Sequence, residues 1–140
     1  MAQASDGLLY GTTVFGGTDD LGTVYRVDLA TDTLATTYSF TLVPPSGRTP
    51  QAPLTQAGDG LLYGTTFTGG EGNAGAVYRV DPASGSVTTI HSFTTTPPHG
   101  AGPTAGLVQA SGRLALRHDV FRRRSLRPAP SIDSIRPVAK

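Results

Sequence analysis

Apolar, aromatic and β-branched residues along this chain come in short runs separated by glycine, proline and aspartate. Runs of this kind occupy residues 8–13, 23–28, 34–40 and 52–56. Their composition is typical of β-strands, and residues 23–28 alternate in a way that places valine and arginine on one face and tyrosine and valine on the other. Because no stretch has helical periodicity, the pattern predicts an all-β chain of short antiparallel strands.

The same pattern returns at a fixed spacing of 53 residues. The block Asp-Gly-Leu-Leu-Tyr-Gly-Thr-Thr occupies residues 6–13 and recurs letter for letter at residues 59–66. Val-Tyr-Arg-Val-Asp at residues 24–28 recurs at residues 77–81, and a Gly-Gly pair, a Ser-Phe pair and a Pro-Pro pair keep the same spacing. Self-similarity at a fixed period indicates repeated units that stack on their neighbours.

Each repeat contains about four short antiparallel strands. A four-stranded sheet of this size cannot bury both of its faces alone, so we expect the repeats to stack as β-propeller-like blades, about two in this chain. A β-solenoid is the structural alternative. The predicted organisation is a first repeat at residues 1–58 that starts in mid-repeat, a second at residues 59–111 and a basic tail at residues 112–140.

The connecting segments carry residues with expected local roles. Gly11 and Gly64 lie inside strands, where glycine indicates a close approach of another group or a bulge. Asp28 and Asp81 end the second strand of each repeat, and we expect both to hydrogen-bond to the following turn. Residues 44–50 contain proline and glycine and are predicted to form a loop.

Taken together, the blocks D-G-x-L-Y-G-T-T, G-G, G-x-V-Y-R-V-D, S-F and G-L-V-Q-A resemble the GloVer repeat of bacterial choice-of-anchor tandem-repeat proteins. The resemblance covers residues 1–111. It implies an exported parent protein, extracellular or on the cell surface, with many repeats and a C-terminal anchor. It implies no catalytic residues. We therefore expect a non-enzymatic fragment with a surface binding or structural role, whose partners are an unknown ligand and the other blades of the parent.

The chain departs from this family pattern in having few copies and no recognisable anchor. Its first six residues lack the basic region and apolar core of a secretory signal. No apolar run is long enough to cross a bilayer, so no membrane insertion is expected. The absence of cysteine excludes a disulfide framework and thiolate metal sites.

The net charge of +1 conceals an uneven distribution. Residues 1–110 carry three basic and eight acidic residues, whereas residues 111–140 carry eight basic and two acidic ones. A basic tail of this kind is typical of nucleic-acid or membrane binders, with Arg122, Arg123 and Arg124 as candidate phosphate contacts. This function is an alternative, but we expect no nucleic-acid binding, because the tail has another explanation.

That explanation is a third repeat translated out of frame. A third Asp-Gly-Leu-Leu-Tyr block is due at residue 112, where the repeat pattern stops. One permitted set of codons for residues 112–124, read one base later, spells Asp-Gly-Leu-Leu-Tyr-Gly-Thr-Thr. Codons for residues 128–140, read two bases later, spell Gly-Thr-Val-Tyr-Arg-Leu-Asp-Pro-Ala-Ser-Gly-Lys, the first eleven residues of which correspond to residues 75–85. Synonymous positions leave freedom in this choice, but both stretches match the expected motif at the expected position.

Two motifs invite a ligand-binding interpretation. Residues 70–75 spell G-x-G-x-x-G, but a dinucleotide site needs this loop to enter a helix, and here a strand follows, so a hairpin loop is expected. Asp19 and Asp20 could contribute to a Ca²⁺ site, but the second repeat has Gly72 and Asn73 there, which favours solvated loop acids.

The remaining candidate chemistry is sparse. His91, His99 and His118 lack metal-ligand spacing, and no serine lies in a nucleophile elbow. We therefore predict no catalytic residue, no cofactor site and no metal site. The enzymatic alternative is a propeller enzyme whose catalytic residues lie in blades outside this sequence.

Two blades supply only one interface and leave both outer faces uncovered. We expect two twisted sheets packed side by side and a disordered tail from residue 112 that adds no blade. Such a chain should be marginally stable and should self-associate through exposed faces and edges.

Overall fold

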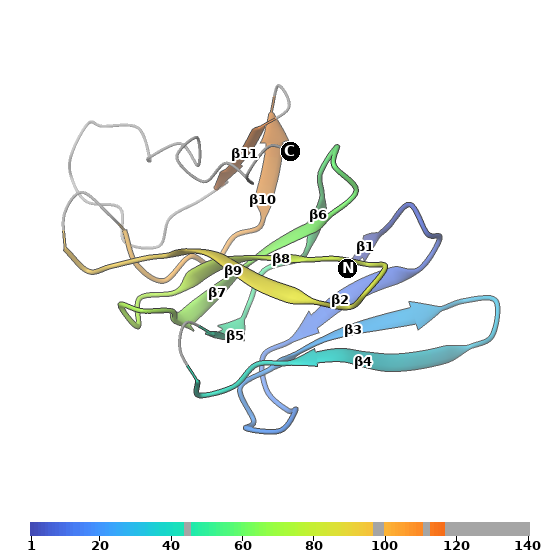
Figure 1. The fold of residues 1–140 in the computed structure, drawn as a ribbon, viewed down its shortest axis with the longest axis horizontal. Helices are drawn as coiled ribbons and strands as arrows, with labels where there is room; N and C mark the ends of the chain where they lie inside the picture. The colour runs from blue at the N-terminus through green and yellow to red at the C-terminus, as the bar shows by residue number, and fades with distance from the viewer. Residues whose placement is uncertain (44–45, 97–99, 111–112, 117–140) are drawn as a thin grey trace.

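The first part of the chain forms a four-stranded antiparallel sheet, in which each strand pairs with the next one along the sequence (Figure 1). The computed structural model describes residues 1–43, 46–96, 100–110 and 113–116. The strands of this first sheet are β1 (Ala2–Gln3), β2 (Leu9–Thr13), β3 (Thr23–Asp28) and β4 (Thr33–Ser39). The predicted strands 8–13, 23–28 and 34–40 are thus confirmed to within one residue at each end.

The second sheet repeats this arrangement with an additional strand. Its order is β5-β7-β8-β9, and β6 also pairs with β7. The strands are β5 (Gly47–Pro50), β6 (Thr55–Gln56), β7 (Leu62–Gly69), β8 (Ala76–Val80) and β9 (Val87–Ser92). The predicted fourth strand at residues 52–56 is shorter than expected.

The prediction of a loop at residues 44–50 is wrong for its second half. Gly47–Pro50 is strand β5, which lies antiparallel to the end of β7, with Gly47 opposite Gly69 and Pro50 opposite Thr66. Proline and glycine are tolerated here because β5 is at the edge of the sheet, where no ladder donor is needed on its outer side. Sequence pattern alone favoured a loop, since neither residue type signals a strand.

A third, smaller sheet follows. It is a hairpin of β10 (Leu107–Ala110) and β11 (Arg113–Leu116). The expectation of a disordered tail from residue 112 is therefore wrong for Arg113–Leu116, whose alternating leucines suit a strand. The prediction of a disordered tail otherwise falls on residues 117–140, outside the described part of the chain.

The strand registers repeat at the spacing seen in the sequence. Leu9 lies opposite Val27 in the first sheet, as Leu62 lies opposite Val80 in the second. An irregularity in the pairing with β4 falls between Val24 and Tyr25, and the corresponding one with β9 falls between Val77 and Tyr78. The 53-residue period is therefore a period of the backbone as well as of the sequence.

The loops repeat in the same way. Ala30 donates its backbone N–H to Asp28 Oδ1 (2.9 Å), and Ala83 donates to Asp81 Oδ1 over the same distance. These bonds confirm the predicted role of the two aspartates, which replace a missing backbone partner in the turn.

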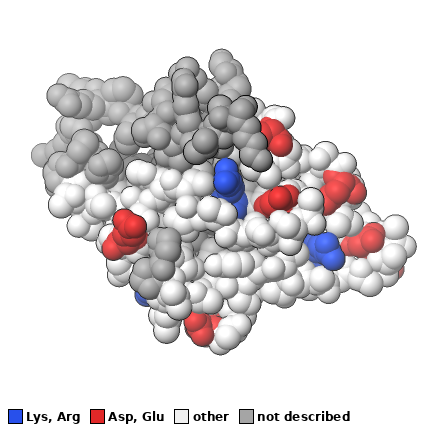
Figure 2. Space-filling view, in the orientation of Figure 1, with Lys and Arg blue, Asp and Glu red and all other residues white. Residues whose placement is uncertain are grey.

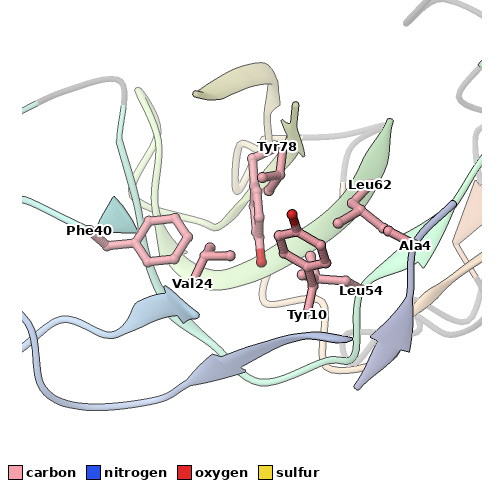
Figure 3. Packing of buried hydrophobic residues seen from close by; sticks show 8 residues of the cluster. Ala4, Tyr10, Val24, Phe40, Leu54, Leu62 and Tyr78 are labelled. Carbon is pink, nitrogen blue, oxygen red and sulfur yellow. The ribbon is translucent and has the colours of Figure 1, made fainter. Parts of the chain in front are cut away.

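The main core lies between the two large sheets (Figure 3). We call the side of a sheet that carries Tyr10 and Val24, or their counterparts Tyr63 and Val77, its front face, and the opposite side its back face. The front face of the first sheet packs on the back face of the second, with these buried residues in one cluster: Ala4, Tyr10, Val24, Phe40, Leu54, Leu62, Tyr78 and Val80.

An edge-to-face ring contact spans this interface. The ring centroids of Phe40 and Tyr78 are 5.2 Å apart at an interplanar angle of 73°, the geometry that aromatic quadrupoles favour. A second cluster lies on the front face of the second sheet, where Leu107 at the start of β10 covers Tyr63, Val77 and Phe93. Each of the two large sheets therefore buries its front face against the structure that follows it in the chain.

Strands at the same position of the 53-residue repeat are neighbours from one sheet to the next. β1 lies near β6, and β6 lies near β10. The sheets thus approach one another along one side, as the ribbon shows (Figure 1). The described part of the chain contains no helix with the length and apolarity needed to cross a bilayer.

Candidate functional site

The polar side chains that recur most regularly form one Asp–Tyr–Arg group in each repeat. In the first repeat the group is Asp6, Tyr10 and Arg26, and Tyr10 donates its hydroxyl proton to Asp6 Oδ2 at 2.9 Å. Arg26 stands opposite Tyr10 across the β2–β3 pair. The tight Asp-Gly turn brings the carboxylate back over the strand, because Asp6 Oδ1 accepts the backbone N–H of Leu8 at 2.9 Å.

The second repeat builds the same group from Asp59, Tyr63 and Arg79. Tyr63 donates to Asp59 Oδ2 at 2.6 Å, and Leu61 donates its backbone N–H to Asp59 Oδ1 at 3.0 Å. Arg79 stands opposite Tyr63. Sequence reasoning found the blocks that supply these residues, but it did not predict the tyrosine–aspartate bond, which joins a turn to a strand across four residues.

The environment of these tyrosines fixes their protonation. Burial raises the pKa of Tyr10 to about 12, the hydrogen bond to Asp6 and its negative charge add to the rise, and Arg26 opposes it. Burial and Asp59 raise the pKa of Tyr63 to about 12 in the same way, with Arg79 opposing. At neutral pH both phenols are protonated and act as hydrogen-bond donors. Each Asp–Tyr–Arg group, which we call a clasp, therefore suits a structural role better than it suits proton abstraction.

The clasp of the first sheet lies at the interface between the two large sheets, which we call the seam. Besides Asp6, the Tyr10 hydroxyl approaches the backbone oxygen of Pro82 in the second repeat at 3.4 Å. Gln56 Nε2 donates to Ser5 Oγ at 3.0 Å across the same seam. These polar contacts join the two large sheets at specific positions, in addition to the apolar cluster.

One buried hydroxyl has no such contact. Tyr78 is almost fully buried at the seam, and burial raises the pKa of its hydroxyl. Within the described residues this hydroxyl has no hydrogen-bond partner. A neutral phenol is tolerated there because its ring contributes apolar area and the Phe40 contact.

The G-x-G-x-x-G motif at residues 70–75 lies in the loop between β7 and β8, as predicted. Asn73 has a positive φ of 52°, and its Oδ1 accepts the backbone N–H of Gly69 at 3.2 Å. Asp20 holds the corresponding loop of the first repeat with φ 57° and a 2.7 Å bond from Gly16. Because a strand follows, this loop lacks the helix N-terminus that a pyrophosphate site requires.

The aspartates considered as calcium ligands bind backbone instead. Asp20 accepts from Gly16, and Asp19 Oδ2 accepts the backbone N–H of Leu42 at 3.0 Å. Among the described residues no three or more His, Cys, Asp and Glu side chains gather as metal ligands would. On the face shown in Figure 2, the charged side chains of the described residues are scattered and form no single patch.

Of the three histidines, only His91 lies among the described residues. His91 in β9 packs edge-on against Phe93, with ring centroids 5.1 Å apart. His99 and His118, like Arg122, Arg123 and Arg124, lie outside the described residues.

The repeated sheets, registers and clasps define a tandem-repeat protein of the all-β class. The family model described as the Gloeobacter/Verrucomicrobia repeat matches residues 1–115. The chain belongs to this family, and the predicted resemblance to the GloVer repeat is confirmed. Searches of curated proteins and of solved structures found no match to the chain.

Proposed function

We propose that this chain is a non-enzymatic part of a larger, exported tandem-repeat protein that presents a binding or structural surface. The observation that carries the proposal is the recurrence of the seam-forming residues from one repeat to the next. The Tyr10 and Tyr63 hydroxyls are held by Asp6 and Asp59 as protonated donors. This repeated structural use of the same side chains supports a scaffold role for the described repeats.

A β-propeller-like arrangement of the repeats accounts for the approach of β1 to β6 and of β6 to β10. In a propeller the blades surround a central axis, so equivalent strands of neighbouring blades lie beside one another near that axis, as β1, β6 and β10 would. The loops between strands then gather at the two ends of the blades, where ligands are set by loop sequence and not by fold.

Surface location is tested by trypsin treatment of intact cells that carry the gene. Cleavage after Arg48 and Arg79 releases the peptide 49–79, which mass spectrometry identifies. We expect this peptide in the fraction released from intact cells, together with known surface proteins and without a cytosolic marker. Recovery of the peptide from lysed cells alone would show that the exported location is wrong.

We further infer that residues 112–140 are a third repeat translated out of frame. The β10–β11 hairpin supports this: Val108 pairs with Ala115, whereas the pairing of Ala2 with Tyr10 places the partner of Val108 at Leu116. In the intact repeats the turn uses an Asp and a Gly with positive φ, such as Gly7 at 85°. Arg113 occupies the position of that glycine, so the same turn is not favoured.

The nucleotide sequence decides the matter directly. The codons of residues 112–124, read one base later, must spell the Asp-Gly-Leu-Leu-Tyr-Gly-Thr-Thr block. Any other reading excludes a frameshift at this position. A protein-level test is the pair of substitutions Gly112→Asp and Arg113→Gly, after which cross-strand nuclear Overhauser contacts should move the partner of Val108 from Ala115 to Leu116.

A further inference from the structure

The back faces of the two large sheets carry matching apolar positions. In the second sheet these residues face the first sheet and are Leu54, Leu62, Tyr78, Val80 and Val87. At the spacing of 53 residues the first sheet has Met1, Leu9, Tyr25, Val27 and Leu34. Leu9, Val27 and Leu34 lie in one row across β2, β3 and β4, as Leu62, Val80 and Val87 do across β7, β8 and β9.

Burial of these matching positions differs sharply. Leu54 is 3% exposed, whereas its counterpart Met1 is 62% exposed. Val87 packs against the core cluster, whereas its counterpart Leu34 is 66% exposed. Tyr25 and Val27 are partly exposed, whereas Tyr78 and Val80 are buried. The local sequences are nearly the same, so the difference in burial arises from the neighbouring sheet. The first sheet covers the back face of the second, whereas nothing in the described structure covers the back face of the first.

The strands β7 and β2, which occupy the same position in the two sheets, differ in length for the same reason. β7 runs to Gly69 because β5, from the segment before it, pairs with its last residues. Gly70 extends this pairing by donating its backbone N–H to Ser46 O at 2.9 Å. β2 has the corresponding residues but ends at Thr13, and its first-sheet partner β1 reaches only Leu9 and Tyr10.

We propose that the back face of the first sheet, together with the strand edge at residues 14–17, is a docking surface for another repeat of the same kind. The docked repeat supplies a front face equivalent to Tyr10, Val24 and Phe40 and an edge strand equivalent to Gly47–Pro50. This inference uses the tandem stacking in the proposed function but needs neither export nor a ligand, so the tests are independent.

Polar groups at the seam support a repeat as the occupant over a generic apolar partner. In the observed interface Tyr10 meets the backbone oxygen of Pro82, and Gln56 reaches Ser5. The first repeat offers Leu29 at the position of Pro82 and Gln3 at the position of Gln56. A docked repeat would satisfy these groups with its own tyrosine and serine, as the first repeat does for the second.

The test is a fusion in which a second copy of residues 1–53 is placed directly ahead of Met1 of the full chain. The new junction joins residue 53 to residue 1 just as the natural chain joins residue 53 to Leu54. Leu34→Asp is then introduced either in the inner copy, whose back face the added repeat would cover, or in the added copy, whose back face stays open.

The inner substitution should lower Tm by about 5–10 °C, because it places a carboxylate in an apolar interface. The outer substitution, and Leu34→Asp in the unfused chain, should each shift Tm by less than about 2 °C, as exposed substitutions do. Val43→Asp in the inner copy is a further control, since Val43 and its counterpart Thr96 are both exposed. Equal effects of the inner and outer Leu34→Asp substitutions would overturn the proposal.

A second measurement does not depend on stability. The chain has no cysteine, so Leu34→Cys provides a single reporter thiol. Its alkylation should be at least about fivefold slower in the inner copy of the fusion than in the unfused chain, whereas Val43→Cys should react at the same rate in both. Equal rates at Leu34→Cys would show that the added repeat does not dock on this face.

Discussion

Tyr78 lies directly across Gly64, and a Cβ atom added to this glycine would stand 2.5 Å from the Tyr78 hydroxyl oxygen. The corresponding pair in the first repeat, Tyr25 and Gly11, has the same close approach. The predicted role of both glycines in close packing is therefore confirmed. Only a residue without a side chain lets the tyrosine ring lie flat against the neighbouring strand.

The two glycines give a first prediction. Gly64→Ala should destabilise the chain by about 2–3 kcal/mol, because Tyr78 is enclosed and the added methyl group would also meet Leu54 Cδ2 at 2.8 Å. Gly11→Ala should cost less, about 1 kcal/mol, because Tyr25 is partly exposed and can turn toward solvent. Urea denaturation followed by circular dichroism compares the two variants, and equal losses would contradict the difference in confinement.

A second prediction concerns the clasp of the second repeat. Leu61 N–H and the Tyr63 hydroxyl donate to different oxygens of Asp59, and Asp59→Asn turns one of these acceptors into an NH2 donor, so stability should fall by about 1–2 kcal/mol. The pKa of Tyr63 should fall below about 12 but stay above its ordinary value, since burial is the largest cause of the shift. The pKa is measured by nuclear magnetic resonance with ¹³C-labelled tyrosine.

Asp81→Asn is the matched control for this experiment. Asp81 accepts the backbone N–H of Ala83 through a single oxygen, which an asparagine can also do. The Tyr63 pKa should therefore be unchanged in Asp81→Asn, and a drop equal to that of Asp59→Asn would argue against the assigned bond.

Alkaline pH gives a third prediction. The pKa values of Tyr10 and Tyr63 are raised to about 12 in the folded chain, above an ordinary value of 10.0. The unfolded chain therefore loses these protons first, so the free energy of unfolding is unaffected below pH 10 and declines as pH rises from about 10 toward about 12.

The decline is measured as the urea midpoint at a series of pH values. Tyr63→Phe removes one of the titrating groups and should make the decline shallower, although it also loses the bond to Asp59. A pH dependence with the same slope in this variant would show that Tyr63 does not contribute to it.

A fourth prediction concerns a β-branched residue in an unfavourable backbone conformation. Thr49 has a positive φ of 53°, and the equivalent position in the next repeat is Gly102 with φ 64°. Both donate a backbone N–H to the preceding loop, Thr49 to Leu21 O at 2.8 Å and Gly102 to Ala74 O at 2.7 Å. The same backbone conformation and hydrogen bond therefore occur at this position in both repeats, and threonine is strained in this conformation.

Thr49→Gly should therefore be neutral or stabilising by up to about 1 kcal/mol, although glycine in a strand normally destabilises. The gain is reduced by loss of the Thr49–Thr68 hydroxyl contact at 3.1 Å. Thermal unfolding of Thr49→Gly and of the reverse change, Gly102→Thr, measures the effect. The reverse change should destabilise, and a loss in Thr49→Gly as large as that in Gly102→Thr would refute the strain.

Most of the local structure followed from the sequence. The sequence predicted the 53-residue period, the aspartate turns, and the strands β2, β3 and β4 with their counterparts β7, β8 and β9. Each of these features depends on residues that are close together in the chain. The role of Gly64 was also readable, since glycine within a strand block indicates a close contact. The family resemblance rests on the same blocks.

Only the tertiary structure decided which of two nearly identical surfaces is buried. Leu9 and Leu62 occupy the same position in the same block, yet Leu62 is fully buried and Leu9 is not. The strand β5 and the greater length of β7 arise in the same way, from a partner supplied by the preceding repeat. Local sequence determines which strands can form, whereas burial and strand pairing depend on what packs against them, and that is set by neighbours distant in the chain.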